Sequence, residues 1–168
     1  MLNASQTEKI KLEHDAAKLF LRLYEKQNAV SMRHIWYNQP KKPDVSCYQN
    51  KQKLDIEIAH VYGSEKEAMA ILGRDLSTET QDELKKLLFI PAKTRLTQAL
   101  QRILKQKAKK HYDSERVWLV IRNANPFWQN QDIQSVKHIL SIPNYHPFEE
   151  IWVIGDIEGK SGLTKLYP

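Results

Sequence analysis

Residues 43–63 read PDVSCYQNKQKLDIEIAHVYG and predict a β-hairpin. Two strand-like runs, 44–48 and 53–61, are joined by the short turn QNKQ, and so short a connection is typical of antiparallel neighbours. The stretch carries three acids, Asp44, Asp55 and Glu57. Burying a carboxylate costs free energy unless the group is paired, so these acids are the first candidates for a functional site.

The rest of the chain predicts further helices and strands around this hairpin. Residues 5–26 have apolar side chains at three-to-four spacing, which indicates a helix, and Ser5 with Glu8 fits a capping box at its start. The other predicted elements are strands at 32–37, 116–122, 150–155 and 163–167 and helices at 64–72, 77–88, 91–112 and 132–140. This order indicates a mixed β-sheet flanked by helices, in the α/β or α+β class. No repeat or linker divides the chain, so we expect one domain over 1–168.

Composition excludes several classes of protein. Hydrophobic residues make up 41% of the 168 residues and charged residues 27%, which is typical of a soluble globular chain. No apolar run approaches the ~20 residues that a membrane-spanning helix needs, and the N-terminal residues do not resemble a secretory signal. Cys47 is the single cysteine, which excludes an intramolecular disulfide and a cysteine-based metal cluster. We therefore expect a cytoplasmic protein without a membrane partner.

The basic residues are concentrated in the middle of the chain. The net charge is +6, and no acid occurs between Glu83 and Asp113. Three basic residues of this segment, Arg102, Lys105 and Lys109, fall on the helix face opposite the apolar stripe. A solvated charged face is the ordinary explanation for such a row. The missing acids favour a second one, in which these side chains bind phosphates of a nucleic acid.

The hairpin acids have the spacing of a metal site. Alternation along a strand points Asp55 and Glu57 to one face, about 7 Å apart, while Leu54 and Ile56 point to the other. Asp44 begins the neighbouring strand and could close the site from the side. Carboxylates and water are the ligands that Mg²⁺ or Mn²⁺ prefers, so we expect one of these ions as the cofactor. A plain solvated hairpin face is the alternative.

The arrangement resembles the PD-(D/E)XK nuclease superfamily. The matching motifs are Pro43-Asp44, the hairpin, and Asp55-Ile56-Glu57, placed in an αβββα order of elements over residues 8–122. The resemblance implies a restriction-endonuclease-like core with additional C-terminal strands. It also implies metal-dependent hydrolysis of phosphodiester bonds in DNA, or less often RNA. Asp44 would bind the metal, with Asp55 or Glu57 as the second acid.

The chain departs from the family pattern at the lysine. That residue should follow the second acid by two positions, which is Glu57 if Asp55 is the acid and Ala59 if Glu57 is. Some family members have glutamate at this place, so the alignment in which Asp55 is the second acid stays open. If Glu57 is the second acid, the lysine must come from elsewhere in the chain. We expect Lys107 to supply it, because Lys107 continues an apolar face of its helix.

Glu13 is a further candidate ligand. It shares a helix face with Phe20 and Tyr24, and similar nucleases often supply a glutamate from this helix. The alternative leaves Glu13 at the edge of the stripe with its carboxylate in water.

The histidine and tryptophans of interest have ordinary explanations. His60, Trp118 and Trp152 fall in apolar strands and are expected in the core. Trp128 lies in a loop, where it could stack on a base or anchor the loop by burial.

Three functions follow from these observations. The first is a DNA-cutting nuclease, for which two copies would be needed to cut both strands, so a homodimer is expected with it. The second is a nuclease-like fold that binds nucleic acid or a protein without cutting, because the family lysine is missing. The third is a structural or interaction protein whose acids are merely solvated.

Overall fold

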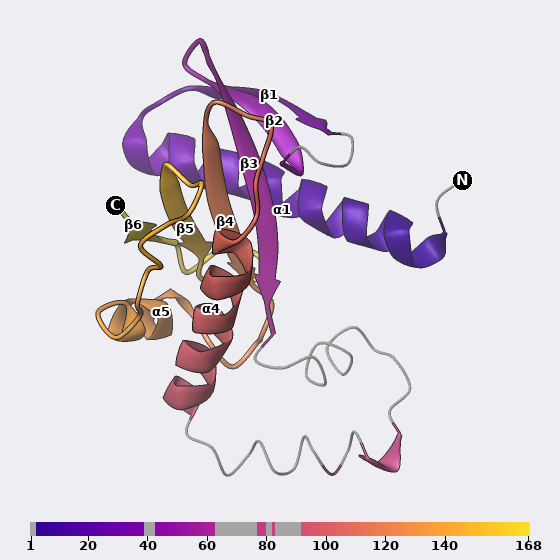
Figure 1. The fold of residues 1–168 in the computed structure, drawn as a ribbon, viewed down its shortest axis with the longest axis vertical. Coiled ribbons are helices and arrows are strands. Elements are labelled where there is room, and N and C mark those ends of the chain that lie inside the picture. The colour runs from indigo at the N-terminus through magenta and orange to yellow at the C-terminus, as the bar shows by residue number, and fades with distance from the viewer. Residues whose placement is uncertain (1–2, 39–42, 63–76, 80–81, 83–91) are drawn as a thin grey trace.

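The structure, a computed structural model, describes residues 3–38, 43–62, 77–79, 82 and 92–168. Within this part, the fold is α+β, with helices packed on a six-stranded mixed sheet in the order β1-β2-β3-β4-β5-β6 (Figure 1). The strands are β1 (Met32–Tyr37), β2 (Val45–Gln49), β3 (Gln52–Val61), β4 (Val117–Asn123), β5 (Glu150–Ile154) and β6 (Leu163–Tyr167). The helices are α1 (Ala4–Asn28), α4 (Ala92–Ala108) and α5 (Asn130–Val136).

The predicted hairpin is confirmed. β2 and β3 are antiparallel, with Val45 opposite Ile56 and Ser46 opposite Asp55. β1 is antiparallel to β2, whereas β3, β4 and β5 are parallel to one another and β6 is antiparallel to β5. A parallel pair needs a crossover connection, and α4 lies in the crossover between β3 and β4.

The two faces of the sheet bury different helices. Leu54, Ile56 and Ile58 of β3 lie in one core with α1, whose Phe20 and Tyr24 contact it. α4 and α5 cover the opposite face (Figure 1). Strands β4 and β5 contribute to both cores, because both of their faces are covered.

α1 begins at Ala4, one residue earlier than the sequence predicts, and the capping prediction is wrong. Asn3 caps the helix by accepting a hydrogen bond from the backbone N–H of Gln6. The Gln6 side chain accepts one in return from the N–H of Asn3. Asparagine caps a helix as well as serine does, and with Asn3 as the cap both Ser5 and Glu8 lie inside the helix.

The exposed fractions of the tryptophan side chains show which of them belong to the core. Trp118 and Trp152 are at most 4% exposed, which confirms that they belong to the core. Trp128 is 2% exposed, so it anchors its loop and its ring face is not available to a base. His60 is partly exposed rather than fully packed.

The later helices are shorter than the sequence suggests. The helix predicted over 91–112 ends at Ala108, and a turn follows in which the N–H of Lys110 donates to the carbonyl of Lys107. The helix predicted over 132–140 is α5. The helix predicted at 64–72, and all but a few residues of that at 77–88, lie outside the described residues. No helix in the described ranges has the length and apolar character that crossing a bilayer requires.

Candidate active site

Asp44 and Glu57 meet where β3 runs past the beginning of β2. Val45 lies opposite Ile56, and extending this register by one residue sets Asp44 opposite Glu57. The Asp44 carboxyl oxygen Oδ2 accepts a hydrogen bond of 2.8 Å from the backbone N–H of Ile58. The carboxyl groups of Asp44 and Glu57 also share a hydrogen bond. The hairpin register therefore brings two acids 13 residues apart in sequence into contact.

Glu57 is surrounded by donors from α4 and the segment after it. Its Oε2 lies 3.0 Å from Lys107 Nζ, 3.4 Å from Lys110 Nζ and 2.6 Å from the hydroxyl of Tyr112. Glu57 is 3% exposed, and the Lys107 side chain is 19% exposed. α4 packs on the sheet face to which Glu57 points, so a lysine on the sheet side of the helix reaches the carboxylate.

The pKa values of the two carboxyl groups shift in opposite directions. Burial raises the pKa of Asp44 to about 8, and the nearby carboxylates of Glu57 and Glu13 add to the rise. Burial opposes ionisation of Glu57 as well, but Lys107 and the hydrogen bonds from Asp44 and Tyr112 hold its pKa below the usual range. Near neutral pH, Asp44 therefore stays protonated, and its O–H donates a hydrogen bond to the Glu57 carboxylate.

Two tyrosines are held as hydrogen-bond donors. Burial and the hydrogen bond to Glu57 raise the pKa of Tyr112. Burial and the hydrogen bond to Glu13 likewise raise the pKa of Tyr37. Both hydroxyls thus stay protonated over the physiological range and point at carboxylates.

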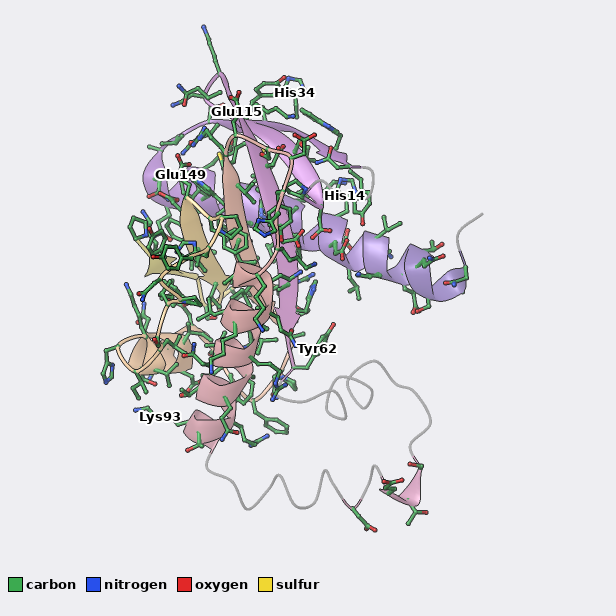
Figure 2. The ribbon with its side chains drawn as sticks, in the orientation of Figure 1. His14, His34, Tyr62, Lys93, Glu115 and Glu149 are labelled. Carbon is green, nitrogen blue, oxygen red and sulfur yellow. The ribbon has the colours of Figure 1, made fainter. Side chains whose placement is uncertain are left out.

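A cavity of about 590 Å³ opens beside the pair. It is lined by residues of α1, β3 and α4 and by Tyr62, which lies below β3 in Figure 2. Its lysines are Lys9, Lys11, Lys107 and Lys110, and its carboxyl groups are Glu8, Glu13, Asp15, Asp44 and Glu57. The lining is therefore of mixed charge, with cations on both flanking helices.

Glu13 lines the same cavity. It is 5% exposed, and its Oε2 accepts a hydrogen bond of 2.8 Å from the Tyr37 hydroxyl. Lys9, one turn earlier on α1, lies 3.7 Å from its other oxygen. The carboxylate is thus held inside the protein and not in water at the edge of the helix.

Asp55 does not line the cavity. Its two oxygens accept hydrogen bonds of 2.5 Å from the hydroxyls of Ser46 and Ser114, and the residue is 3% exposed. The Lys53 ammonium lies 3.9 Å away. The structure therefore brings together Asp44, Glu57, Lys107 and Glu13, and it places Asp55 in a separate hydroxyl-lined site.

The Asp44–Glu57 pair fits a hydrated divalent cation. In the part of the chain that the structure describes, no three His, Cys, Asp or Glu side chains gather closely enough to hold a metal ion. Mg²⁺ is commonly held by only one or two carboxylates and keeps several waters. Two carboxyl groups that share a proton offer such a donor set, because a bound cation takes the place of the proton.

Arg102, Lys105 and Lys109 lie away from this site. All three are exposed and none lines the cavity. Arg102 and Lys105 lie on the side of α4 opposite Leu100 and Leu104, which are at most 1% exposed, and Lys109 follows the end of the helix. The basic face predicted from the sequence is therefore a separate surface.

Sequence reasoning missed three members of the site. Lys110 follows Lys107 by three residues, a spacing that puts neighbouring side chains on one side of a helix, so this signal was available. Tyr112 and Tyr37 carry no pattern that sets them apart from other half-buried tyrosines. Their roles depend on contacts between elements distant in sequence.

Comparison of the chain with models of known protein families, with curated proteins and with solved structures found no match in any of the three.

Proposed function

We propose that the protein is a metal-dependent nuclease of the PD-(D/E)XK kind that hydrolyses phosphodiester bonds in DNA. The contact between Lys107 Nζ and Glu57 Oε2, at 3.0 Å, carries the proposal. If Glu57 is the second acid of the motif, the strand has Ala59 where the family has lysine. α4 supplies a lysine to the same carboxylate from outside the strand.

The element order supports a restriction-endonuclease-like core. α1, the three strands β1 to β3, and α4 follow one another in the αβββα order, and the two helices lie on opposite faces of the sheet. Glu57 lies on β3, and Asp44 immediately precedes the antiparallel neighbour β2. β4 to β6 extend this core with α5 packed on them.

Each residue has a role in the proposal. Asp44 and Glu57 would hold Mg²⁺ or Mn²⁺, and Glu13 would accept hydrogen bonds from water around the ion. When bound, the ion supplies charge neutralisation at the phosphate and a water of lowered pKa. Lys107 orients a phosphate oxygen or the attacking water, and Tyr112 fixes the Glu57 carboxylate.

Plasmid nicking tests the proposal. In Mg²⁺ or Mn²⁺ the wild-type protein should convert supercoiled DNA to the open circle, whereas Glu57→Gln and Lys107→Met should not. Lys93→Gln is the matched control, because Lys93 lies on the same helix, is exposed and does not line the cavity. Equal nicking by the wild type and Glu57→Gln would remove Glu57 from the reaction.

A second candidate function is binding without cleavage. One oxygen of Glu57 already accepts three hydrogen bonds, which is an arrangement that a purely structural ion pair would also have. A protein that binds DNA but leaves it intact over a series of divalent metals and substrates would favour this alternative.

A further inference from the structure

Three aromatic side chains lie together over β1 and β2. The ring centroid of Tyr48 lies 5.8 Å from that of Trp36 and 6.2 Å from that of His34. Trp36 is 38% exposed, whereas the other three tryptophans are at most 4% exposed. Figure 2 shows His34 at the upper end of the sheet, opposite the end where Tyr62 lies. We refer to Trp36, Tyr48 and His34 as the aromatic platform.

A β-bulge in β1 turns Trp36 outward. Arg33 lies opposite Tyr48 and Trp36 lies opposite Ser46, so β1 has one more residue than β2 between these two pairs. In an unbroken register Trp36 would lie opposite Val45, which is fully buried in the core under α1. Bulges re-aim side chains and are common beside functional sites. The irregularity in β1 therefore exposes an indole that would otherwise point to the core.

The surroundings of the aromatic platform are basic. Lys53 lies opposite Tyr48 on β3, and its side chain is 51% exposed. Lys51, in the hairpin turn, is exposed as well. Arg33, also on β1, is paired with Glu25, so Lys51 and Lys53 supply the positive charge beside the rings.

The aromatic platform and Glu57 lie on the same side of the sheet. Trp36, Ser46 and Asp55 form one row across β1, β2 and β3, and Glu57 follows Asp55 by two residues. Strand spacing and rise put the Cα atoms of Trp36 and Glu57 roughly 12 Å apart. A chain bound on the aromatic platform would therefore have its neighbouring nucleotides within reach of the cavity.

We propose that the aromatic platform stacks the unpaired bases of a single-stranded nucleic acid, with Lys51 and Lys53 contacting its phosphates. A duplex hides its base faces in the helical stack, whereas a single strand offers them to aromatic side chains, and basic groups beside the rings follow the backbone. The inference names the substrate class of the proposed nuclease, and only its link to cutting rests on that proposed function.

Tryptophan fluorescence can test the stacking directly, because Trp36 is the exposed indole among the four. A 15-residue oligo(dT), added in EDTA so that no cutting occurs, should quench the fluorescence and bind more tightly than its duplex with oligo(dA). Trp36→Ala should lose the quenching and weaken single-strand binding roughly 5- to 150-fold, the range for one stacked base. Phe127→Ala is the matched control, since Phe127 is 79% exposed but lies in the loop after β4.

Three outcomes would overturn the proposal: equal affinities of the wild type and Trp36→Ala for oligo(dT), quenching of equal size by heparin, which has charge but no bases, and no binding of oligo(dT) at all. Cleavage assays in Mg²⁺ or Mn²⁺, on plasmid DNA and on oligo(dT), separate this proposal from the nuclease. Cleavage of either substrate without Trp36-dependent quenching would leave the nuclease standing and reject the aromatic platform. Quenching without cleavage of either substrate in any divalent metal would support the aromatic platform and reject the nuclease.

Discussion

Lys107 Nζ lies 3.0 Å from Glu57 Oε2 and joins α4 to β3 across 50 residues of sequence. The pair is mostly out of water, since the side chains are 19% and 4% exposed. An ion pair in this setting gives little net stability, but removing one partner leaves an uncompensated buried charge. The contact therefore ties the position of α4 to the ionised state of Glu57.

Replacing Lys107 by methionine should destabilise the fold. Glu57 would keep its hydrogen bonds to Lys110 and Tyr112, so we expect a loss of ~1–3 kcal/mol in the free energy of unfolding, less than for an unpartnered buried carboxylate. Urea denaturation at neutral pH measures the difference. Lys105→Met, at an exposed position of the same helix, should change stability by less than ~0.5 kcal/mol. Equal effects of the two substitutions would contradict the prediction.

Tyr112→Phe removes the shortest of the three hydrogen bonds to Glu57. A hydrogen bond to a charged group contributes ~1.5–3 kcal/mol, and we expect a loss of this size in urea denaturation. Tyr145→Phe is the control, because Tyr145 is 91% exposed. If Tyr112→Phe were as stable as the wild type, the hydroxyl would not be holding the carboxylate.

Stability should fall as the pH rises toward 8. The pKa of Asp44 is about 8 in the folded protein, above its value of ~3.9 in an unfolded chain. Between these two values the folded state binds a proton that the unfolded state has released, so the stabilisation is complete below about pH 4 and is lost as the pH passes about 8.

Asp44→Asn tests this pH dependence. The asparagine amide can donate to Glu57 as the protonated acid does, and its oxygen can accept from Ile58 N–H. Thermal denaturation between pH 5 and pH 9 should therefore give a flatter curve for Asp44→Asn than for the wild type. Parallel curves would show that Asp44 is ionised throughout the range.

Divalent metal should stabilise the wild-type protein more at pH 8 than at pH 6. A ligand that binds only the folded state stabilises it by about 1.4 kcal/mol at ten times its Kd, and here the ion must also displace the Asp44 proton. Thermal denaturation in Mn²⁺ measures the shift, and the double variant Asp44→Ala/Glu57→Ala should lose it. An unchanged shift in that variant would place the ion elsewhere.

The basic residues on α4 and just after it should contribute to binding but not to cutting. If Arg102, Lys105 and Lys109 each contact a phosphate, the plot of log K against log salt should become shallower by up to roughly 2.7 when all three are glutamine. Binding of a duplex at several salt concentrations gives this slope. An unchanged slope would leave these residues as a solvated helix face.

The sequence alone determined much of the sheet. Alternation in the hairpin predicted which side of β3 is apolar, and Leu54 and Ile56 lie in the core under α1 as that pattern requires. Such predictions depend only on the alternation of apolar and polar residues and on the length of the turn, and both can be read from the sequence. The same signals placed Asp44 beside Glu57, because a short turn fixes the register of a hairpin.

Tertiary structure decided which acids form the candidate site. Asp55 and Glu57 are two residues apart on β3, so their side chains point to the same side of the sheet. Two serine hydroxyls nevertheless bind Asp55, whereas Lys107 pairs with Glu57. Lys107 and Ser114 both lie in the crossover between β3 and β4, and their positions follow from how α4 packs on the sheet. The bulge that exposes Trp36 is equally invisible in the sequence, because a one-residue shift in strand pairing depends on both strands together.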